Sequence, residues 1–218
     1  MSLAARLFAL PVRTAEMDPR GASGELFAVE EAALARAVPK RRREFLAGRI
    51  CARRAMAALG EPSAPIPQGE DRAPVWPQGL IGSITHTDTW CAAAVARRAD
   101  GVQALGLDVE SAEPLRLDLL RIICRSEERA FIRKQPAAER GLLGKLVFSA
   151  KESAFKCQYA LSRRMLGYHA MSIRVDLAAR RFVATFHEAA GPFARGDELE
   201  GVLLVERGYV MTAVALPH

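Results

Sequence analysis

Periodic segments follow one another along this chain in an irregular order, and that order restricts the fold. Residues 41–59 and 142–159 have apolar side chains at helical spacing, and each of these segments is followed by shorter ones with strand-like alternation. A doubly wound parallel sheet requires a regular β-α-β-α order, which this chain lacks. We therefore predict an α+β fold.

The expected elements also suggest two halves. The hairpin expected over 81–96 faintly resembles the one over 202–216, which indicates an internal duplication with a boundary near residue 105. We therefore predict an N-terminal half, residues 1–105, and a C-terminal half, residues 106–218. The further expectations are helices over 25–37 and within 115–134, an extended proline-rich loop over 62–77, and strands over 5–12, 80–86, 90–96, 104–110, 170–175, 181–186, 200–205 and 209–216.

Length and composition exclude several classes of protein. With 218 residues, half of them apolar, the chain can bury a core, and no stretch approaches the roughly 18 consecutive apolar residues that span a bilayer. The apolar run at residues 7–10 ends at Pro11, so it is too short for a secretory signal. The four cysteines lie far apart, which argues against a zinc site or a disulfide framework. We expect a soluble cytoplasmic protein with no membrane partner.

The excess positive charge is concentrated in one segment. Residues 40–54 contain seven cations and one anion, Glu44, so this segment carries the whole formal net charge of +6. Such an element suits a polyanionic ligand or an acidic partner, although a solvated basic helix explains the same charges. On a helical wheel Arg42, Arg49 and Arg53 lie beside the apolar stripe, where they can border a cleft. We expect the stripe that faces the core to consist of Phe45, Ala52, Met56 and Leu59.

Two carboxylates lie on one face of an expected strand. Asp108 and Glu110 are two residues apart, and the strand before them is apolar. Neighbouring like charges repel unless a cation separates them, and carboxylate oxygens suit Mg²⁺ that also binds phosphate oxygens and water. On the second long helix Glu152 can complete a metal site, while Lys156, four residues on, contacts a phosphate. The alternatives are a solvated strand end and an ordinary surface ion pair.

The run Gly82-Ser83-Ile84-Thr85-His86 is a third group suited to phosphate binding. Glycine allows close backbone approach, and serine, threonine and histidine side chains can all donate to phosphate oxygens. The run is not the turn that exposes a nucleophilic serine in hydrolases, because no glycine closes it.

Four motifs thus occur in a defined order along the chain. They are Arg49-x-x-x-Arg53, then Trp76-Pro77-x-Gly79-x-x-Gly82-Ser83-Ile84-Thr85-His86, then Gly106-Leu107-Asp108-Val109-Glu110, and finally Phe148-Ser149-Ala150-Lys151-Glu152-Ser153-Ala154-Phe155-Lys156. The series resembles the surfactin-type 4′-phosphopantetheinyl transferases, particularly the branch that contains the enterobactin synthetase D component. The resemblance covers residues 25–175. Thr85 stands where this family often has serine, and Leu107 and Val109 where isoleucine is common, and none of these changes removes a functional group.

The resemblance implies a fold and an activity. Members of this family are monomers of two similar α+β halves related by a pseudo-twofold axis, with coenzyme A bound in the cleft between them. They transfer the phosphopantetheine arm of coenzyme A to a serine of an apo acyl or peptidyl carrier protein, and adenosine 3′,5′-bisphosphate is released. The carriers serve siderophore, peptide, polyketide or fatty acid synthesis and are acidic around the modified serine. Arg41, Arg42, Arg43 and Arg125 are candidates to meet that acidic partner.

The resemblance also implies a role for each motif residue. Glu152 would accept the proton of the carrier serine, directly or through a metal-bound water, and Lys156 would contact the pyrophosphate. Arg49 and Arg53 would hold the 3′-phosphate, and His86 would bind phosphate oxygens. The expected metal is Mg²⁺, with Mn²⁺ as an alternative, held by Asp108, Glu110 and Glu152, and the remaining coenzyme A contacts are Ala73 and Pro74 at the adenine and Gly82, Ser83 and Thr85 at the phosphates.

Two other functions fit part of the pattern. Nucleic-acid binding would explain the basic segment, but it leaves the three carboxylates repelling a phosphate backbone, and no RNA- or DNA-binding motif is present. A different Mg²⁺ phosphotransferase would explain the carboxylates, but neither a P-loop nor kinase motifs occur. We therefore expect no nucleic-acid partner.

Overall fold

The computed structural model describes residues 2–9 and 11–218. The chain divides into two compact units, one formed by Met1–Leu105 with Pro217–His218 and one formed by Gly106–Leu216. Each unit combines a β-sheet with a long helix, which confirms the predicted α+β class. In the part of the chain that is described, no helix has the length and apolar character that crossing a membrane requires.

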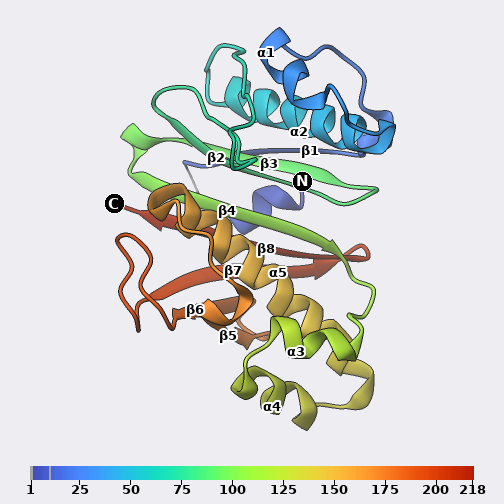
Figure 1. The fold of residues 1–218 in the computed structure, drawn as a ribbon, viewed down its shortest axis with the longest axis vertical. Helices are drawn as coiled ribbons and strands as arrows, with labels where there is room; N and C mark the ends of the chain where they lie inside the picture. The colour runs from blue at the N-terminus through green and yellow to red at the C-terminus, as the bar shows by residue number, and fades with distance from the viewer. Residues whose placement is uncertain (1, 10) are drawn as a thin grey trace. The chain divides into compact units, whose positions relative to one another are not determined.

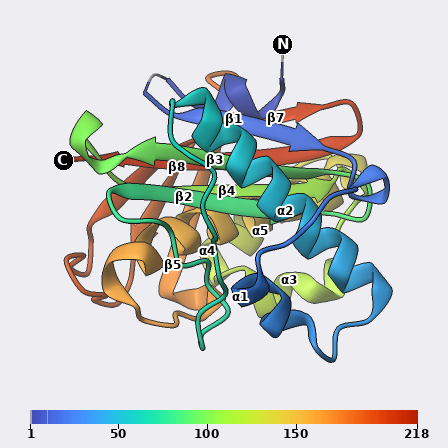
Figure 2. The same cartoon turned by 90° about the horizontal axis from the view of Figure 1, so that it is seen from above.

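Unit 1 has an antiparallel sheet of three strands in the order β1-β3-β2. These are β1 (Arg13–Met17), β2 (Leu80–His86) and β3 (Cys91–Arg97). The helix α2 (Pro39–Ala58) packs across this sheet, as Figure 2 shows from above. Figure 1 shows the short helix α1 (Ala28–Glu31) beside α2. Single turns of 3-10 helix lie at Ala4–Leu7, Pro19–Gly21, Ala32–Leu34 and Arg98–Asp100.

The predicted core stripe of the basic helix is largely confirmed. Phe45, Ala52 and Met56 are all buried, whereas Leu59 is half-buried. Close packing of α2 on β2 depends on Gly48, because a Cβ there would lie 2.9 Å from the Ile84 side chain.

The N-terminal elements differ from expectation. The strand predicted over 5–12 is wrong, since Ala4–Leu7 forms a 3-10 turn and the strand begins only at Arg13. Position 10 of that range lies outside the described residues. The proline at position 11 lacks an N–H to donate to a neighbouring strand, so pairing with β3 starts beyond it, at Arg13 opposite Val95. The helix predicted over 25–37 is shorter, because a 3-10 turn replaces it after Glu31. The segment 62–77 contains no helix, as its prolines predict.

Unit 2 contains most of a five-stranded sheet, in the order β4-β8-β7-β6-β5. The helix α5 (Ala137–Ser162) packs against β5, β6 and β7 of this sheet. Two shorter helices, α3 (Leu120–Ile123) and α4 (Ser126–Lys134), pack on α5 (Figure 1). The strands are β4 (Val102–Ser111), β5 (Met171–Asp176), β6 (Arg181–Phe186), β7 (Glu198–Glu206) and β8 (Tyr209–Pro217), and 3-10 turns lie at Leu117–Leu119 and Tyr168–Ala170.

Candidate functional site

The strand β4 and the helix α5 come into direct backbone contact at Gly106. A Cβ at this position would lie 1.8 Å from the Ser153 carbonyl oxygen and 3.0 Å from the Cys157 nitrogen, so only glycine fits. This contact explains the glycine that begins the Gly-x-Asp-x-Glu motif. It brings the acidic end of β4 beside the motif residues of α5.

Asp108 is the central carboxylate of this site, and its side chain is almost fully buried. Its Oδ2 accepts a hydrogen bond of 2.9 Å from Ser149 Oγ, and its Oδ1 accepts one of 2.8 Å from Lys156 Nζ. Lys156 Nζ also donates to the Leu107 carbonyl oxygen at 2.9 Å. An ammonium has three N–H donors, and these two acceptors use two of them. Ser149 was not assigned a role from the sequence, because a serine on a helix carries no distinctive signal.

The other two predicted metal ligands are electrostatically linked to Asp108. Burial raises the pKa of Glu110, and the Asp108 charge raises it further, although Lys145 Nζ lies 3.2 Å from Glu110 Oε2. Burial likewise raises the pKa of Glu152, where Lys156 acts in the opposite direction and Asp108 again raises it. The Asp108 carboxylate thus repels both Glu110 on β4 and Glu152 on α5.

This donor set fits a hard divalent cation. All three side chains offer carboxylate oxygens, and a bound cation would relieve the repulsion that raises the pKa values of Glu110 and Glu152. Within residues 2–9 and 11–218, however, no three acidic, histidine or cysteine side chains are already drawn together as a metal cluster. Lys145 and Lys156 are the counter-ions of Glu110 and Asp108 in this structure.

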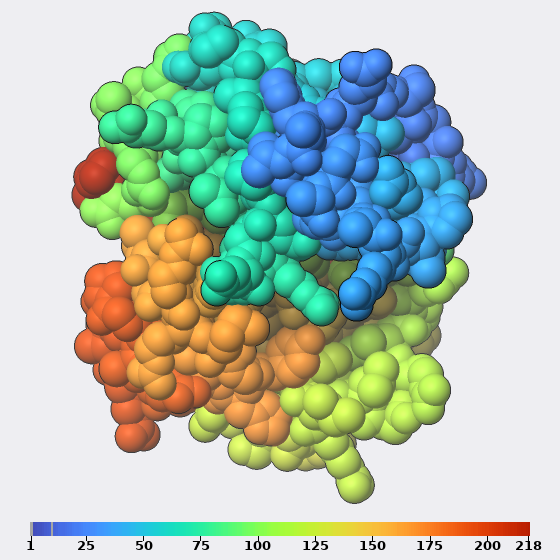
Figure 3. Space-filling model, turned by 45° about the horizontal axis from the view of Figure 1, so that its top comes forward, coloured from blue at the N-terminus to red at the C-terminus, as the bar shows by residue number. Residues whose placement is uncertain are grey.

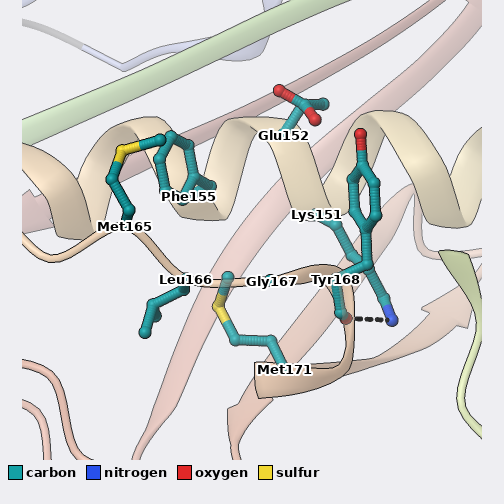
Figure 4. Close-up of a pocket in the computed structure, with 8 residues that line it drawn as sticks. All are labelled: Lys151, Glu152, Phe155, Met165, Leu166, Gly167, Tyr168 and Met171. Atoms are coloured by element: carbon teal, nitrogen blue, oxygen red, sulfur yellow. Dashed lines mark hydrogen bonds between the residues drawn. The ribbon is translucent and has the colours of Figure 1, made fainter. Parts of the chain in front are cut away.

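A cavity of about 350 Å³ lies beside Glu152. Figure 4 shows Glu152 and the Tyr168 hydroxyl at this cavity, with the Phe155 and Met165 side chains nearby. The Tyr168 hydroxyl interacts with Glu152 and lowers the pKa of that carboxyl. Burial, reinforced by the Glu152 charge, raises the pKa of Tyr168 to about 12, so the phenol stays a hydrogen-bond donor at neutral pH. Sequence reasoning missed Tyr168, because a lone aromatic residue in a loop is uninformative.

Lys151 is another residue that lines this cavity. Its buried ammonium donates at 2.8 Å to each of three oxygens: the Ile123 carbonyl, the Tyr168 carbonyl (Figure 4) and the Glu128 carboxylate. Burial lowers the pKa of Lys151, and the Glu128 charge opposes that shift. Neither Lys151 nor Glu128 was assigned a role from the sequence.

In unit 1 the arginines of α2 gather around a buried guanidinium. Arg49 is only 6% exposed, and its guanidinium carbon Cζ lies over the Phe45 ring, 3.8 Å from the ring centre. Burial lowers the pKa of Arg49 to about 10, Glu30 raises it, and the charges of Arg41 and Arg53 lower it further. A cluster of cations that is both desolvated and self-repelling favours a bound anion.

His86 belongs to this basic region. Arg41 donates to His86 Nε2 at 3.4 Å, and His86 Nδ1 lies 3.8 Å from Glu44 Oε2. Arg41, a candidate contact for an acidic partner in the sequence analysis, therefore lies beside the predicted phosphate ligand His86. The side chains of Ser83 and Thr85 are buried and, by strand alternation, point to the opposite face of β2 from His86.

The remaining predicted contacts lie in and beside the segment 62–77. Gly82 makes room for Trp76, since a Cβ there would lie 2.6 Å from the indole ring. Ala73 and Pro74 form part of a small hairpin-like turn. The Gly69 N–H donates to the Ala73 carbonyl at 2.9 Å, and Gln68 forms an isolated antiparallel β-bridge with Pro74.

Comparison with known proteins covers both units. A family model described as the 4′-phosphopantetheinyl transferase N-terminal domain matches residues 29–96, and one described as the 4′-phosphopantetheinyl transferase superfamily matches residues 104–214. The 4′-phosphopantetheinyl transferase Svp of Streptomyces mobaraensis is 40% identical over 195 residues, which are 88% of this chain and 78% of Svp.

Two further relatives agree. The 4′-phosphopantetheinyl transferase PptT of Mycobacterium tuberculosis is 38% identical over 197 residues, covering 86% of this chain and 85% of PptT. Enterobactin synthase component D of Escherichia coli is 40% identical over 120 residues, which are 54% of each chain. With one family model covering more than half of the chain, and with relatives this similar along most of its length, the protein belongs to the 4′-phosphopantetheinyl transferase superfamily.

Proposed function

We propose that this 4′-phosphopantetheinyl transferase uses coenzyme A as donor and an acidic apo carrier protein as acceptor. The carrier serine hydroxyl attacks the phosphorus that bears the pantetheine arm. A new phosphorus–oxygen bond forms to the serine, the bond to the bridging pyrophosphate oxygen breaks, and adenosine 3′,5′-bisphosphate leaves. The observation that carries this proposal is the convergence of Asp108, Glu152 and Lys156 through the contact of β4 with α5.

Residues of unit 2 would perform the chemistry. Glu152 accepts the proton of the serine hydroxyl, and Tyr168 orients this carboxylate by its hydroxyl. Lys156 donates its third N–H to the pyrophosphate. Asp108, Glu110 and Glu152 would hold Mg²⁺, which when bound supplies positive charge to offset that of the pyrophosphate.

Residues of unit 1 would bind the nucleotide phosphates. Arg49 and Arg53 contact the 3′-phosphate, with Arg41 and His86 adding donors to phosphate oxygens. The energetic support is the repulsion of the Arg49 guanidinium by Arg41 and Arg53, which a bound anion would offset. The backbone around Ala73 and Pro74 lines the adenine site.

The cavity beside Glu152 suits the pantetheine arm. Its walls include Phe155, Leu166, Tyr168 and Met171, and an arm that is mostly aliphatic gains free energy when it leaves water for such a lining. The cavity opens next to the carboxylate that is proposed to accept the proton. An arm bound there would have its phosphate end near the reacting groups.

The direct test is transfer itself. The protein is incubated with coenzyme A, Mg²⁺ and a panel of apo carriers, and each carrier is analysed by mass spectrometry for addition of the phosphopantetheine arm on its serine. We expect modification of at least one carrier and release of adenosine 3′,5′-bisphosphate in equal amount. Release of any other nucleotide would contradict the proposed bond cleavage.

The metal ligands are tested by replacing them one at a time. Asp108→Ala and Glu152→Ala should each lower turnover by about 100-fold or more, because each removes a charge that the reaction needs. Glu113→Ala, which removes an exposed carboxylate just beyond β4, is the matched control and should keep wild-type turnover. Near wild-type turnover of either site variant at limiting Mg²⁺ would show that the ligand assignment is wrong.

A further inference from the structure

Glu30 is a buried carboxylate in unit 1 that joins three separate segments. Its side chain is fully buried. It accepts hydrogen bonds from the backbone N–H of Phe27 at 3.0 Å, from the backbone N–H of Ile66 at 2.8 Å, and from Arg53 Nη1 at 2.9 and 3.0 Å. One carboxylate thus ties the start of α1 and the proline-rich segment to the basic helix α2. In Figure 3 the teal proline-rich segment lies at the surface beside the blue N-terminal residues.

The same carboxylate acts on Arg49 through Ile66. While the N–H of Ile66 donates to Glu30 Oε1, its carbonyl oxygen accepts a hydrogen bond of 2.8 Å from Arg49 Nε. With Nε bonded to Ile66 and the guanidinium carbon held over the Phe45 ring, the direction of the two Arg49 Nη groups is restricted. Glu30 therefore orients Arg53 directly and Arg49 through one residue.

Unit 2 contains the same arrangement around Glu128. Each carboxylate accepts a hydrogen bond from the backbone N–H three residues before it. Each also accepts one from a cation on the long helix 23 residues after it, which is Arg53 for Glu30 and Lys151 for Glu128. Glu128 also accepts from the backbone N–H of Ile173, as Glu30 does from Ile66. In unit 2 the cation adjoins the site residue Glu152, and in unit 1 the cation lies one helical turn from Arg49. Both copies thus lie next to residues of the proposed site.

We propose that Glu30 is a positioning residue for recognition of the 3′-phosphate, a role that rests on the function proposed above. It holds Arg53 and, through Ile66, Arg49 in the orientation that binds this phosphate. Its own negative charge opposes the binding of an anion. If positioning dominates, removing the carboxylate should weaken binding of the 3′-phosphate. If its charge dominates, removing it should strengthen that binding, so the two effects can be told apart by experiment.

The experiment measures binding of adenosine 3′,5′-bisphosphate and of AMP to the full-length protein by calorimetry. The wild type should bind the bisphosphate at least 10-fold more tightly than AMP. Glu30→Gln should reduce this ratio by about 10-fold or more, which corresponds to about 1.4 kcal/mol. Glu30→Asp keeps the charge but is shorter by one methylene, so it should also reduce the ratio. Kinetics should agree, with KM for coenzyme A rising more than kcat falls.

Glu128→Gln is the matched control, since it breaks the equivalent buried contacts in unit 2. Thermal unfolding should show that both variants lose stability, whereas only the Glu30 variants lose the preference for the 3′-phosphate. A ratio in Glu30→Gln that equals or exceeds the wild-type ratio overturns the proposal, as does an equal loss of the ratio in Glu128→Gln. A wild type that binds the two nucleotides equally would instead show that the proposed phosphate site is wrong.

Discussion

Single residues decide whether the carboxylates of this protein are held in place. Asp108 is almost fully buried, and its two oxygens are bonded by different residues of α5, Ser149 and Lys156. Ser149 is itself part of a buried network, because Thr212 Oγ1 donates to its carbonyl oxygen at 2.7 Å. If Asp108 binds the metal as proposed, the hydroxyl that orients it is expected to matter almost as much as the carboxylate.

Removing the Ser149 hydroxyl should therefore impair catalysis without unfolding the protein. We expect Ser149→Ala to lower turnover by about 10- to 100-fold. The control is Ser153→Ala on the same helix, because Ser153 Oγ is also buried but donates to the Ala150 carbonyl rather than to a carboxylate. The carrier mass assay measures both rates. An equal loss in the two variants would mean that the hydroxyls serve only the packing of α5.

Gly106 is the residue at which the site is most sensitive to volume. Gly106→Ala should destabilise the protein by about 3 kcal/mol or more, because the new methyl group overlaps the backbone of α5, which cannot move aside as a side chain would. Gly21→Ala introduces the same methyl group where nothing lies within 4 Å and should be nearly neutral. Urea unfolding of the two variants gives the comparison. A stable Gly106→Ala protein would contradict the close packing of β4 on α5.

At the scale of elements, buried ion pairs hold helices and loops together in each unit. Lys151 and Glu128 link α5 to the start of α4, to β5 and to the loop that contains Tyr168. Such a pair gains little net free energy over apolar packing, but breaking one half of it leaves the other charge buried and unpaired. The pair therefore fixes which elements meet, rather than adding much to the total stability.

Lys151→Met should accordingly lower the free energy of unfolding by about 3–5 kcal/mol. The substitution leaves the buried Glu128 charge without its counter-ion and removes the donor to the Ile123 and Tyr168 carbonyl groups. Lys134→Met on α4 removes an exposed lysine and should change the stability by less than about 0.5 kcal/mol. Denaturant titration measures both. A small loss in Lys151→Met would show that its three hydrogen bonds are readily replaced by water.

At the scale of the whole molecule, the distribution of charge bears on the choice of partner. The chain has a formal net charge of +6, all of it accounted for by residues 40–54. Part of that charge belongs to Arg41, Arg49 and Arg53, which are proposed to bind phosphate, and part of it, such as that of Arg43, is exposed. An exposed cation would steer an acidic carrier protein towards the enzyme, and its field would be screened by salt.

The KM for an acidic carrier should therefore rise several-fold between about 50 and 500 mM salt at saturating coenzyme A, with little change in kcat. Arg43→Gln should raise this KM at low salt and weaken its salt dependence. Arg181→Gln, an exposed arginine on β6, is the control and should do neither. A KM that does not depend on salt would argue against an electrostatically guided encounter.

What the sequence determined by itself is the set of elements and the chemistry they carry. Alternation and helical spacing predicted α2, α5 and the strands from β2 onwards within a few residues, because each of these segments has one apolar face that must be buried. The order of the four motifs indicated the family, which the comparisons confirm. The first strand was misplaced, because its apolar signal begins before Pro11 and the pairing begins after it.

The tertiary structure alone decided how the polar side chains are paired. It placed Arg41 against His86, Ser149 on Asp108, and Glu30 between Arg53 and Ile66. These contacts join residues up to 45 positions apart, and a spacing rule for one helix or strand cannot reach that far. Local periodicity is set by backbone geometry within an element, whereas the partner of a buried charge depends on which elements pack together.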